Sequence, residues 1–571
     1  MILINLKSDF MKRIYMLGVC FIIVSLCYSQ ELFVKDAFTR SQNDTYKINT
    51  YLETIYYEDY YSGSLDYSVF SLDTINITIP NRGVTIKYKL YEKNDDKWIG
   101  ESLNGMGTLI IIINGKKVLA YATFNNESYQ ISSLDSQLSI LVKLDLSRYN
   151  DESLCATSNT VSFLDIDSDS YKVVPPPLGL IRVLVAYTPM AASTSFDIVA
   201  SIKMAVEQTN SSYRNSTVNL RLQLAACICV DYQEVQSEYG YETDLARFTG
   251  KNDGYMDQVH ALRDIYSADV CVLVEKVYNN KLGGIARAIY ADESTAFCVV
   301  SNSALTGNYS FAHEIGHLQG ARHDIGTDPN TSPFAYGHGY ISPSKRWRTI
   351  MAYPVPNTYC ARILYWSNPD IIYPVDNTPM GSYNKEDNAR VLNQFGVRVA
   401  NFRPYEYTVI VPNIDIGAAE YSSLVSGSTM ENSGNIIVES GGELNMCALD
   451  LIKLSPGFHA KRGSKLTINN SLLGTVARVL NTSDVKSSNH TSINNSVESD
   501  DGYVNYSNGI LNLKEYNLIK KVSIFNLNGV EVEVIVPKSN EVNLLHLSPG
   551  IYIVKILSFN NEFFSCNILI E

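Results

Sequence analysis

Three of the chain's eight histidines lie within eleven residues, in the segment HEIGHLQGARHD at 313–324. If the segment begins as a helix, His313 and His317 are four residues apart, so their imidazoles lie one turn apart on the same face. Imidazole nitrogens are common ligands of zinc, at about 2 Å from the ion. The spacing therefore predicts that His313 and His317 bind Zn2+.

The neighbouring residues complete a candidate catalytic site. Glu314 lies beside both histidines, where its carboxylate reaches a water molecule rather than the metal, so it is the candidate general base. Gly320 can end the helix and turn the chain, which lets His323 return as a third nitrogen ligand. Three protein ligands leave a coordination position open for water, which distinguishes a catalytic zinc site from a structural one.

The alternative is a coincidental group of histidines on a surface helix. At this composition HExxH arises by chance in roughly one such chain per hundred or fewer, and the added glycine and third histidine lower that about a thousandfold. The pattern therefore favours a metal site, with every ligand and the base intact.

The pattern HExxHxxGxxH resembles the zinc signature of the metzincin metallopeptidases. The resemblance implies an α/β, zincin-like catalytic domain and a methionine turn beneath the metal. The segment RTIMAY at 348–353 supplies that turn at Met351. In some metzincins a tyrosine two residues after the methionine contacts zinc or the transition-state oxyanion, which makes Tyr353 a further candidate.

Within the metzincins, residues 180–403 resemble the peptidyl-Asp metalloendopeptidases. The matching segments are AHEIGHLQGARHD (312–324), YGHGY (336–340), WRTIMAY (347–353) and ARILYWSNPDI (361–371). The resemblance implies an endopeptidase that cuts beside Asp. It also implies that the loop after the methionine turn walls the pocket for the residue that follows the cut.

A preference for Asp requires a cationic pocket, because a carboxylate is recognised by Arg or Lys. The sequence does not choose among its candidates, and His338, in a Gly-flanked loop, is expected to be structural rather than a fourth ligand. The candidates are Arg287, Lys345, Arg346, Arg348 and Arg362.

Strands and helices alternate from residue 178 to 404, which predicts an α/β layer with sites at strand ends and on adjoining helices. The segment 283–290 reads as an edge strand that can pair with an extended substrate. Buried strands are expected at 181–187, 220–230 and 268–277, and helices at 196–213 and 255–266.

Composition limits the other functions. The 571 residues are enough for roughly three to five units, and 45% hydrophobic residues are enough for sizeable cores. The formal net charge is −13 without a long basic run, so nucleic acid is not an expected partner.

Residues 1–29 read as a signal peptide, because Lys12 and Arg13 precede an apolar run too short for a stable transmembrane anchor. We therefore expect a secreted, extracellular or cell-surface protein. Residues 30–177 read as a β-rich propeptide with hairpins near Gly83 and Gly115. A thiolate at Cys155 could occupy the open metal position, although a disulfide or a core thiol is the more common role.

The C-terminal part reads as β-sandwich modules. Residues 405–468 form a β-rich module, of which 435–468 resemble a stacked-β module of secreted proteins. Residues 469–515 form an Asn/Ser-rich linker, and 516–571 resemble the C-terminal sorting domain of type IX secretion substrates. That resemblance implies the secretion machinery as a partner. Export permits disulfides, and Cys298 with Cys360 is the pairing we expect, because both flank 313–324.

These features favour a secreted zinc-dependent endopeptidase that acts on proteins or peptides, with Glu314 as general base. The alternative is a surface adhesin or binding protein with a secondary or inactive protease domain, which intact Glu314 disfavours. A third interpretation is a zinc hydrolase acting on non-peptide substrates, which the methionine turn disfavours.

Overall fold

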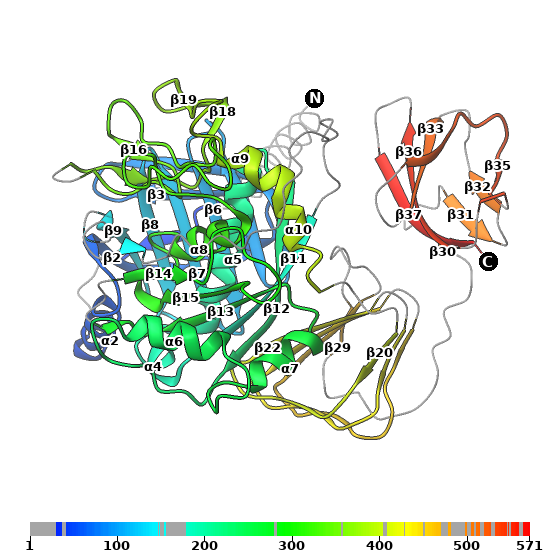
Figure 1. Cartoon of the computed structure of the whole chain (residues 1–571), viewed down its shortest axis with the longest axis horizontal. Coiled ribbons are helices and arrows are strands. Elements are labelled where there is room, and N and C mark those ends of the chain that lie inside the picture. The colour runs from blue at the N-terminus through cyan, green and yellow to red at the C-terminus, as the bar shows by residue number, and fades with distance from the viewer. Residues whose placement is uncertain are drawn as a thin grey trace, which may run out of the picture.

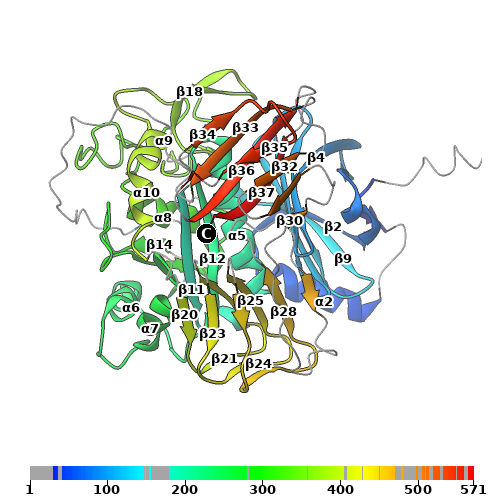
Figure 2. The same ribbon diagram turned by 90° about the vertical axis from the view of Figure 1, so that its right-hand side faces the viewer.

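The computed structural model has a strand-rich architecture of several packed sheets (Figures 1 and 2). It describes residues 30–146 except 37–40, residues 148 and 154–155, and residues 179–403 except 279–281 and 356–357. It also describes 408–469 except 427–428 and 449–450, and separate stretches between 478 and 570. The expected signal peptide at 1–29 lies outside these residues.

The N-terminal unit is a nine-stranded antiparallel sheet in the order β1-β2-β9-β8-β7-β6-β5-β4-β3. Helix α2 (Gln42–Leu52) and the short helix η1 (Tyr67–Ser71) accompany it. The strands are β1 (Phe33–Lys35), β2 (Tyr57–Leu65), β3 (Thr74–Ile79), β4 (Val84–Asn94), β5 (Lys97–Ser102), β6 (Thr108–Asn114), β7 (Lys117–Phe124), β8 (Glu127–Ser133) and β9 (Ser139–Leu144). The two predicted hairpins are confirmed as β3–β4 and β6–β7.

The apolar run in β6 is explained by burial on both faces of this sheet. Leu109 and Ile111 belong to a core within the N-terminal unit, whereas Ile110 and Ile112 belong to the core that surrounds helix α5 (Ile198–Asn215) of the next unit. Because successive strand residues point to opposite faces, a strand buried on both sides is continuously apolar. The N-terminal sheet therefore shares a hydrophobic core with the second unit.

The second unit is built on a mixed sheet in the order β10-β14-β15-β13-β11-β12, which continues into a third unit. Strands β12, β11, β13 and β15 run parallel to one another, and β14 is antiparallel to β15. The strands are β10 (Leu154–Cys155), β11 (Gly179–Tyr187), β12 (Leu220–Cys229), β13 (Val270–Glu275), β14 (Leu282–Ala286) and β15 (Phe297–Ser301).

Helices cover both faces of this sheet. Apolar residues of α5 and α8 (Ser310–Gln319) pack in one core, and those of α6 (Gly240–Thr249) and α7 (Gln258–Ile265) pack in another. Short elements complete the unit. They are α4 (Pro189–Ser193), η3 (Asn302–Ala304), β16 (Trp347–Arg348), β17 (Ala361–Arg362), β18 (Asn368–Tyr373), β19 (Thr378–Met380), α9 (Asn388–Val391), η4 (Leu392–Gly396) and α10 (Val397–Val399).

The predicted strands and helices of this unit are confirmed to within a few residues, with two corrections. Helix α6 was not predicted. The segment expected as a free edge strand over 283–290 forms β14 only to Ala286, and its outer side pairs with β10. A pairing between strands so distant in sequence leaves no local sequence signal.

The third unit is a coil of parallel strands in which each strand stacks on the one 22 residues earlier, or 21 residues earlier between β20 and β23. Ile414 pairs with Ile436, which pairs with Phe458, and the other sides repeat the pattern. The three sides are β20-β23-β26, β21-β24-β27 and β22-β25-β28. The strands are β20 (Thr408–Val411), β21 (Ile414–Ile416), β22 (Tyr421–Ser426), β23 (Thr429–Asn432), β24 (Ile436–Val438), β25 (Glu443–Ala448), β26 (Leu451–Lys453), β27 (Phe458–Ala460), β28 (Lys465–Asn469) and β29 (Arg478–Leu480).

Opposite charges stack along this coil at the same spacing. Lys453 pairs with Glu431 at 2.5 Å, and Lys465 pairs with Glu443 at 2.7 Å. A short helical or strand window cannot detect a 22-residue period, so the local pattern predicted only short strands and turns here. The stacking agrees with the resemblance of residues 435–468 to a stacked-β module.

The coil is joined to the second unit through both backbone and charge. Strand β22 pairs antiparallel with β12, so the sheet continues from one unit into the other. Lys203 of α5 lies 2.6 Å from Glu443, and Lys465 also contacts Asp96 of the N-terminal unit. All three units therefore meet at one cluster of ion pairs.

The C-terminal strands form two four-stranded sheets with one core. The strands are β30 (Val497–Glu498), β31 (Val504–Ser507), β32 (Ile510–Leu513), β33 (Ile519–Asn526), β34 (Glu531–Ile535), β35 (Glu541–Asn543), β36 (Gly550–Ser558) and β37 (Phe563–Ile570). Leu511 and Leu513 belong to this core, so the module begins before residue 516 and the expected linker ends earlier than predicted. Among the described residues, no helix is long and apolar enough to cross a membrane.

The expected Cys298–Cys360 disulfide is wrong. Both cysteines are free and fully buried, Cys298 in β15 and Cys360 before β17. Flanking a motif in sequence does not bring two thiols together in space, because disulfide formation requires close Cα atoms and suitable Cβ directions.

Arg182 in β11 provides a test of the link between the second and third units. Its guanidinium is fully buried and donates to Tyr266 O at 2.9 Å, to Gln223 Oε1 at 2.6 Å and to Ser423 O in β22 at 2.7 Å. We expect Arg182→Met to lower the free energy of unfolding by about 3 kcal/mol or more, because buried carbonyls lose their donors. For a domain of this size the thermal midpoint falls by about 6 °C or more.

Thermal denaturation of the full chain, followed by circular dichroism, measures this effect. Arg346→Met, in an exposed loop, is the matched control and is expected to leave the midpoint nearly unchanged. Equal midpoints for Arg182→Met and wild type would show that the guanidinium does not stabilise the junction.

Candidate metal site

Helix α8 carries the predicted histidine pair through the interior of the second unit. All ten of its residues are buried, and His313 and His317 are 2% and 0% exposed. The helix ends at Gly320, whose φ of 109° is a left-handed conformation that favours glycine. The chain then turns back and places His323 against the pair.

The three imidazoles converge at one point. The Nε2 atom of His323 lies 3.1 Å from Nε2 of His313 and 3.0 Å from Nε2 of His317. One ligand atom from each of the three residues lies within 4.8 Å of the others, which fits a shared metal ion. Among the residues that the structure describes, this is the one such His/Cys/Asp/Glu group.

Backbone carbonyls fix the orientation of these rings. His313 Nδ1 lies 2.9 Å from Ile350 O, and His317 Nδ1 lies 2.9 Å from Ala321 O. Because a carbonyl can only accept, both Nδ1 atoms donate, and in a neutral ring Nε2 then presents its lone pair. This is the arrangement that outer-shell partners give to metal-binding histidines.

Burial keeps the three rings neutral. It lowers the pKa of His313 and His317 well below the usual 6.5, and the neighbouring imidazoles lower them further. Burial, followed by the charges of Arg362 and Arg322, lowers the pKa of His323 to about 3. Neutral rings are the form that binds a metal ion.

Glu314 lies against the neighbouring strand β14. It is 1% exposed, and a Cβ atom added to Gly284 would lie 2.6 Å from Glu314 Cγ and 2.7 Å from Glu314 Oε1. Only glycine therefore allows β14 to pass this close to the carboxylate. A peptide paired along β14 would be adjacent to Glu314.

Met351, the candidate for the methionine turn, lies against helix α8. It is fully buried, and a Cβ atom added to Gly316 would lie 3.0 Å from its Sδ atom. Ile350, the preceding residue, supplies the carbonyl that orients His313. The methionine turn therefore supports α8 between its two histidines.

Tyr353 and His338 hold the third histidine. The Tyr353 ring stacks on His323 with centroids 4.4 Å apart, and its backbone N–H donates to Asp324 Oδ2 at 3.0 Å. His338 is buried and its Nδ1 donates to His323 O at 2.8 Å. His338 thus contacts the backbone of a histidine of the site.

Strand β10 lies along the outer side of β14. It pairs in parallel, with Leu154 opposite Leu282 and Cys155 opposite Gly284, the residue that touches Glu314. A segment of the N-terminal part thus occupies the edge expected for substrate. The possible role of the Cys155 thiol lies outside what is described for its side chain.

The structure separates the five basic candidates. Arg287, Lys345 and Arg346 are exposed, whereas Arg348 and Arg362 are buried and pair side by side in β16 and β17. Sequence analysis did not find Gly284 or the carbonyls of Ile350 and Ala321. A single glycine and backbone atoms carry no local signal of their place in a site.

A family model described as Metallo-peptidase family M12 matches residues 180–367. A peptidyl-Asp metalloendopeptidase of Xanthomonas campestris pv. campestris is 38% identical over 335 residues, covering 56% of this chain and 78% of its own length. Another, from Stenotrophomonas maltophilia, is 37% identical over 333 residues, covering 56% and 78%. The solved metalloproteinase-II from Bacteroides fragilis aligns over 44% of this chain and 81% of its own, with 11% identity and a TM-score of 0.31.

The neutral histidines predict a stability that depends on pH in the metal-free protein. Their folded pKa values lie below the unfolded value of about 6.5, so the unfolded chain binds more protons at pH values between the two. Stability is therefore fully present above pH 6.5 and is lost as the pH falls toward 3, by up to about 1.4 kcal/mol per histidine per pH unit.

Chemical denaturation of metal-free protein between pH 7 and 4 measures this slope. We expect His323→Gln to reduce the number of protons taken up on unfolding, and hence the slope, by about one proton. His459→Gln, on an exposed strand of the coil, should leave the slope unchanged. Equal slopes in wild type and His323→Gln would show that His323 is not buried in the neutral form.

Proposed function

The chain belongs to the family of the peptidyl-Asp metalloendopeptidases and is a metalloendopeptidase, and from this premise we propose that it is a secreted zinc enzyme that hydrolyses peptide bonds in proteins with Glu314 as general base. The observation that carries the proposal is the convergence of three neutral imidazoles beside a buried glutamate and a strand that passes against that glutamate.

His313, His317 and His323 are the residues that would hold the ion. Three nitrogen donors with oriented rings suit Zn2+, and the short Nε2–Nε2 distances are those of donors drawn toward one cation. Zinc bound there supplies Lewis-acid chemistry, by lowering the pKa of water and polarising the scissile carbonyl.

Glu314 handles the proton. In the proposed reaction its carboxylate takes a proton from the attacking water and passes it to the leaving amine. Its place against Gly284 sets it beside any peptide that pairs with β14, so one side chain reaches both the water and the scissile bond. Burial excludes bulk water from competing for that proton.

Tyr353 is proposed to assist at the carbonyl oxygen. Its ring is fixed by stacking on His323, and its backbone is held by Asp324. A phenol held beside the third histidine is suited to donate a hydrogen bond as negative charge develops on the oxygen.

The substrate preference is proposed to be a cut beside Asp. Relatives that share 36–38% of aligned residues carry the name peptidyl-Asp metalloendopeptidase. Two buried arginines flank the methionine turn in sequence, Arg348 before Met351 and Arg362 after it, and they supply the cation that a carboxylate would need.

We further propose that the N-terminal unit keeps the enzyme latent. Strand β10 occupies the edge of β14 opposite Glu314, so a substrate cannot pair there. The N-terminal sheet also packs on α5 through a shared core. Cleavage within residues 156–178 would separate the unit covalently and allow β10 to leave.

Export is proposed from the two ends of the chain. Residues 1–29 have the composition of a signal peptide, and the C-terminal strands form a compact two-sheet module suited to a sorting domain for type IX secretion. The enzyme would then act outside the cell or at its surface.

Glu314→Gln tests the proposed chemistry. We expect hydrolysis of a mixed peptide library by the activated full chain to fall by about 10²- to 10⁴-fold, because the amide cannot accept the proton. Metal content should stay at the wild-type level, since the three histidines are untouched. Wild-type rates in a folded, metal-loaded Glu314→Gln protein would exclude Glu314 as the base, and the absence of cuts by zinc-loaded wild type would refute the peptidase proposal.

Latency is tested on a full chain that carries a recognition site for a specific protease between residues 170 and 178. Cutting is expected to raise peptide hydrolysis at least about tenfold, because competition at the β14 edge is removed. The same protease added to unmodified chain is the control. Cys155→Ser in the uncut chain separates blockade by the strand from a thiolate ligand, since only the latter predicts activity without cutting. Full activity of the uncut wild-type chain would refute latency.

A further inference from the structure

Arg362 connects the chain just before helix α8 with the chain just after Met351. Its Nη1 donates to Asn308 O at 2.8 Å, just before helix α8, and its Nη2 lies 3.4 Å from Ala352 O, just after Met351. These carbonyls position the guanidinium. The side chain thus places a positive charge between the start of the active-site helix and the methionine turn.

Arg362 differs from the adjacent arginine in its contacts. Arg348, its neighbour in β16, is fully buried and donates to Ala352 O at 3.0 Å and to Cys360 O. Arg348 therefore braces the loop, whereas Arg362 also lines a cavity.

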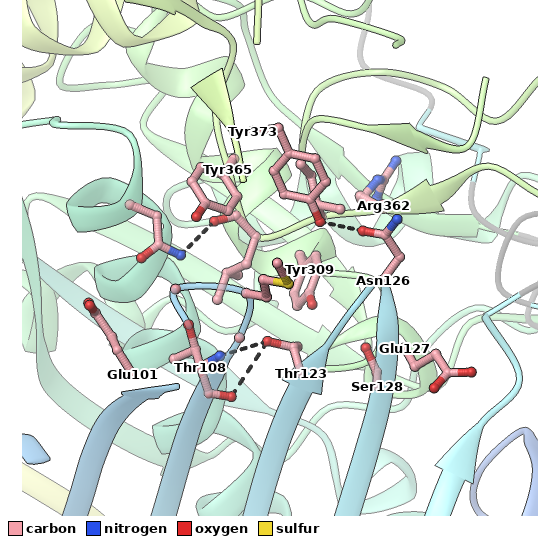
Figure 3. Close-up of a pocket in the computed structure, with 16 residues that line it drawn as sticks. Glu101, Thr108, Thr123, Asn126, Glu127, Ser128, Tyr309, Arg362, Tyr365 and Tyr373 are labelled. Carbon is pink, nitrogen blue, oxygen red and sulfur yellow. Dashed lines mark hydrogen bonds between the residues drawn. The ribbon is translucent and has the colours of Figure 1, made fainter. Parts of the chain in front are cut away.

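A cavity lies at Arg362 (Figure 3). On the side of the second unit its walls include Tyr309, Leu364, Tyr365 and Tyr373. Arg362 is the one cationic residue among the cavity's lining residues, in a mainly aromatic and aliphatic wall on this side. Glu101 and Glu127 also line the cavity, and both belong to the N-terminal unit, so their charges would leave with it. The wall that remains, with one fixed guanidinium among aromatic and aliphatic side chains, is matched to a short anionic group.

The N-terminal unit closes the other side of this cavity. The loops around Gly105 and Asn126 line it, and Tyr373 donates a hydrogen bond to Asn126 Oδ1. The Tyr309 and Tyr121 hydroxyls lie 2.9 Å apart across the same boundary. Departure of this unit would therefore open the cavity.

We propose that Arg362 is the specificity-determining residue that binds the carboxylate of the substrate residue following the scissile bond. The proposal rests on the proposed function, and it assigns that carboxylate to one of the five basic candidates named from the sequence. The three exposed candidates have no such enclosure. A fixed guanidinium in a low-dielectric pocket gives a charged partner a large advantage over its neutral isostere.

The test compares peptides that differ only in the residue after the cut: Asp, Asn, Glu or Ala. For the activated full chain we expect kcat/KM to favour Asp over Asn by at least about 100-fold. In Arg362→Gln this ratio should fall to less than about tenfold, mainly because kcat/KM for the Asp peptide decreases, while hydrolysis of the Asn and Ala peptides continues.

Arg346→Gln is the matched control, and its ratio should equal that of wild type because the residue is exposed. Arg348→Gln tests the rival assignment. Arg362→Lys keeps the charge but not the planar fork, so its ratio should fall about tenfold; it carries the test if the glutamine variant does not fold. Thermal midpoints and metal content establish that each variant is intact.

The outcomes separate the two proposals. A wild-type ratio retained in intact Arg362→Gln or Arg362→Lys, or an equal loss in Arg346→Gln, would overturn the assignment. If the Asp/Asn ratio of kcat/KM fell in Arg348→Gln but not in Arg362→Gln, the carboxylate would be assigned to Arg348, and the proposal for Arg362 would be overturned. Cleavage by wild type without preference for Asp would refute this inference and leave the peptidase standing, whereas no cleavage of any peptide would refute the proposed function itself.

Discussion

Three imidazoles can share one metal ion only while their rings are neutral and their lone pairs point at one place. Burial supplies the first condition by lowering the pKa of all three histidines. The carbonyls of Ile350 and Ala321 supply the second by accepting from Nδ1. Much of the second unit serves these two conditions, because the histidine helix must be enclosed and the two carbonyls must be held against it.

The enclosure depends on how sheet edges are covered. A mixed sheet has two edges whose backbone groups are available to another strand. At one edge, β22 of the coil pairs with β12, and Arg182 fixes the joint with buried hydrogen bonds. At the other edge, β10 pairs with β14 beside Glu314. One edge is thus used for structure, and the other is the edge on which substrate and the N-terminal segment would compete.

Ion pairs connect these units at a distance from the metal site. Lys97 contacts Glu92 of its own unit at 2.8 Å and Glu207 of α5 at 2.7 Å, and Lys465 joins the coil to Asp96. The N-terminal sheet additionally buries Ile110 and Ile112 against the core around α5. Separation of the N-terminal unit would therefore expose apolar surface as well as charge, so covalent cleavage and dissociation are physically distinct steps.

The sequence by itself determined the histidine site and the order of strands and helices around it. HEIGHLQGARHD encodes its own geometry, because helical spacing sets His313 and His317 on one face and Gly320 permits the turn that returns His323. Alternation of apolar residues likewise placed β11, β12, β13 and the two β-hairpins, since those patterns are local. Tertiary structure alone decided the partners of β14 and β12, the 22-residue stacking of the coil, the free state of Cys298 and Cys360, and the place of Arg362. Each of these depends on contacts between residues far apart in the chain. The type of a residue does not indicate which distant residue it contacts.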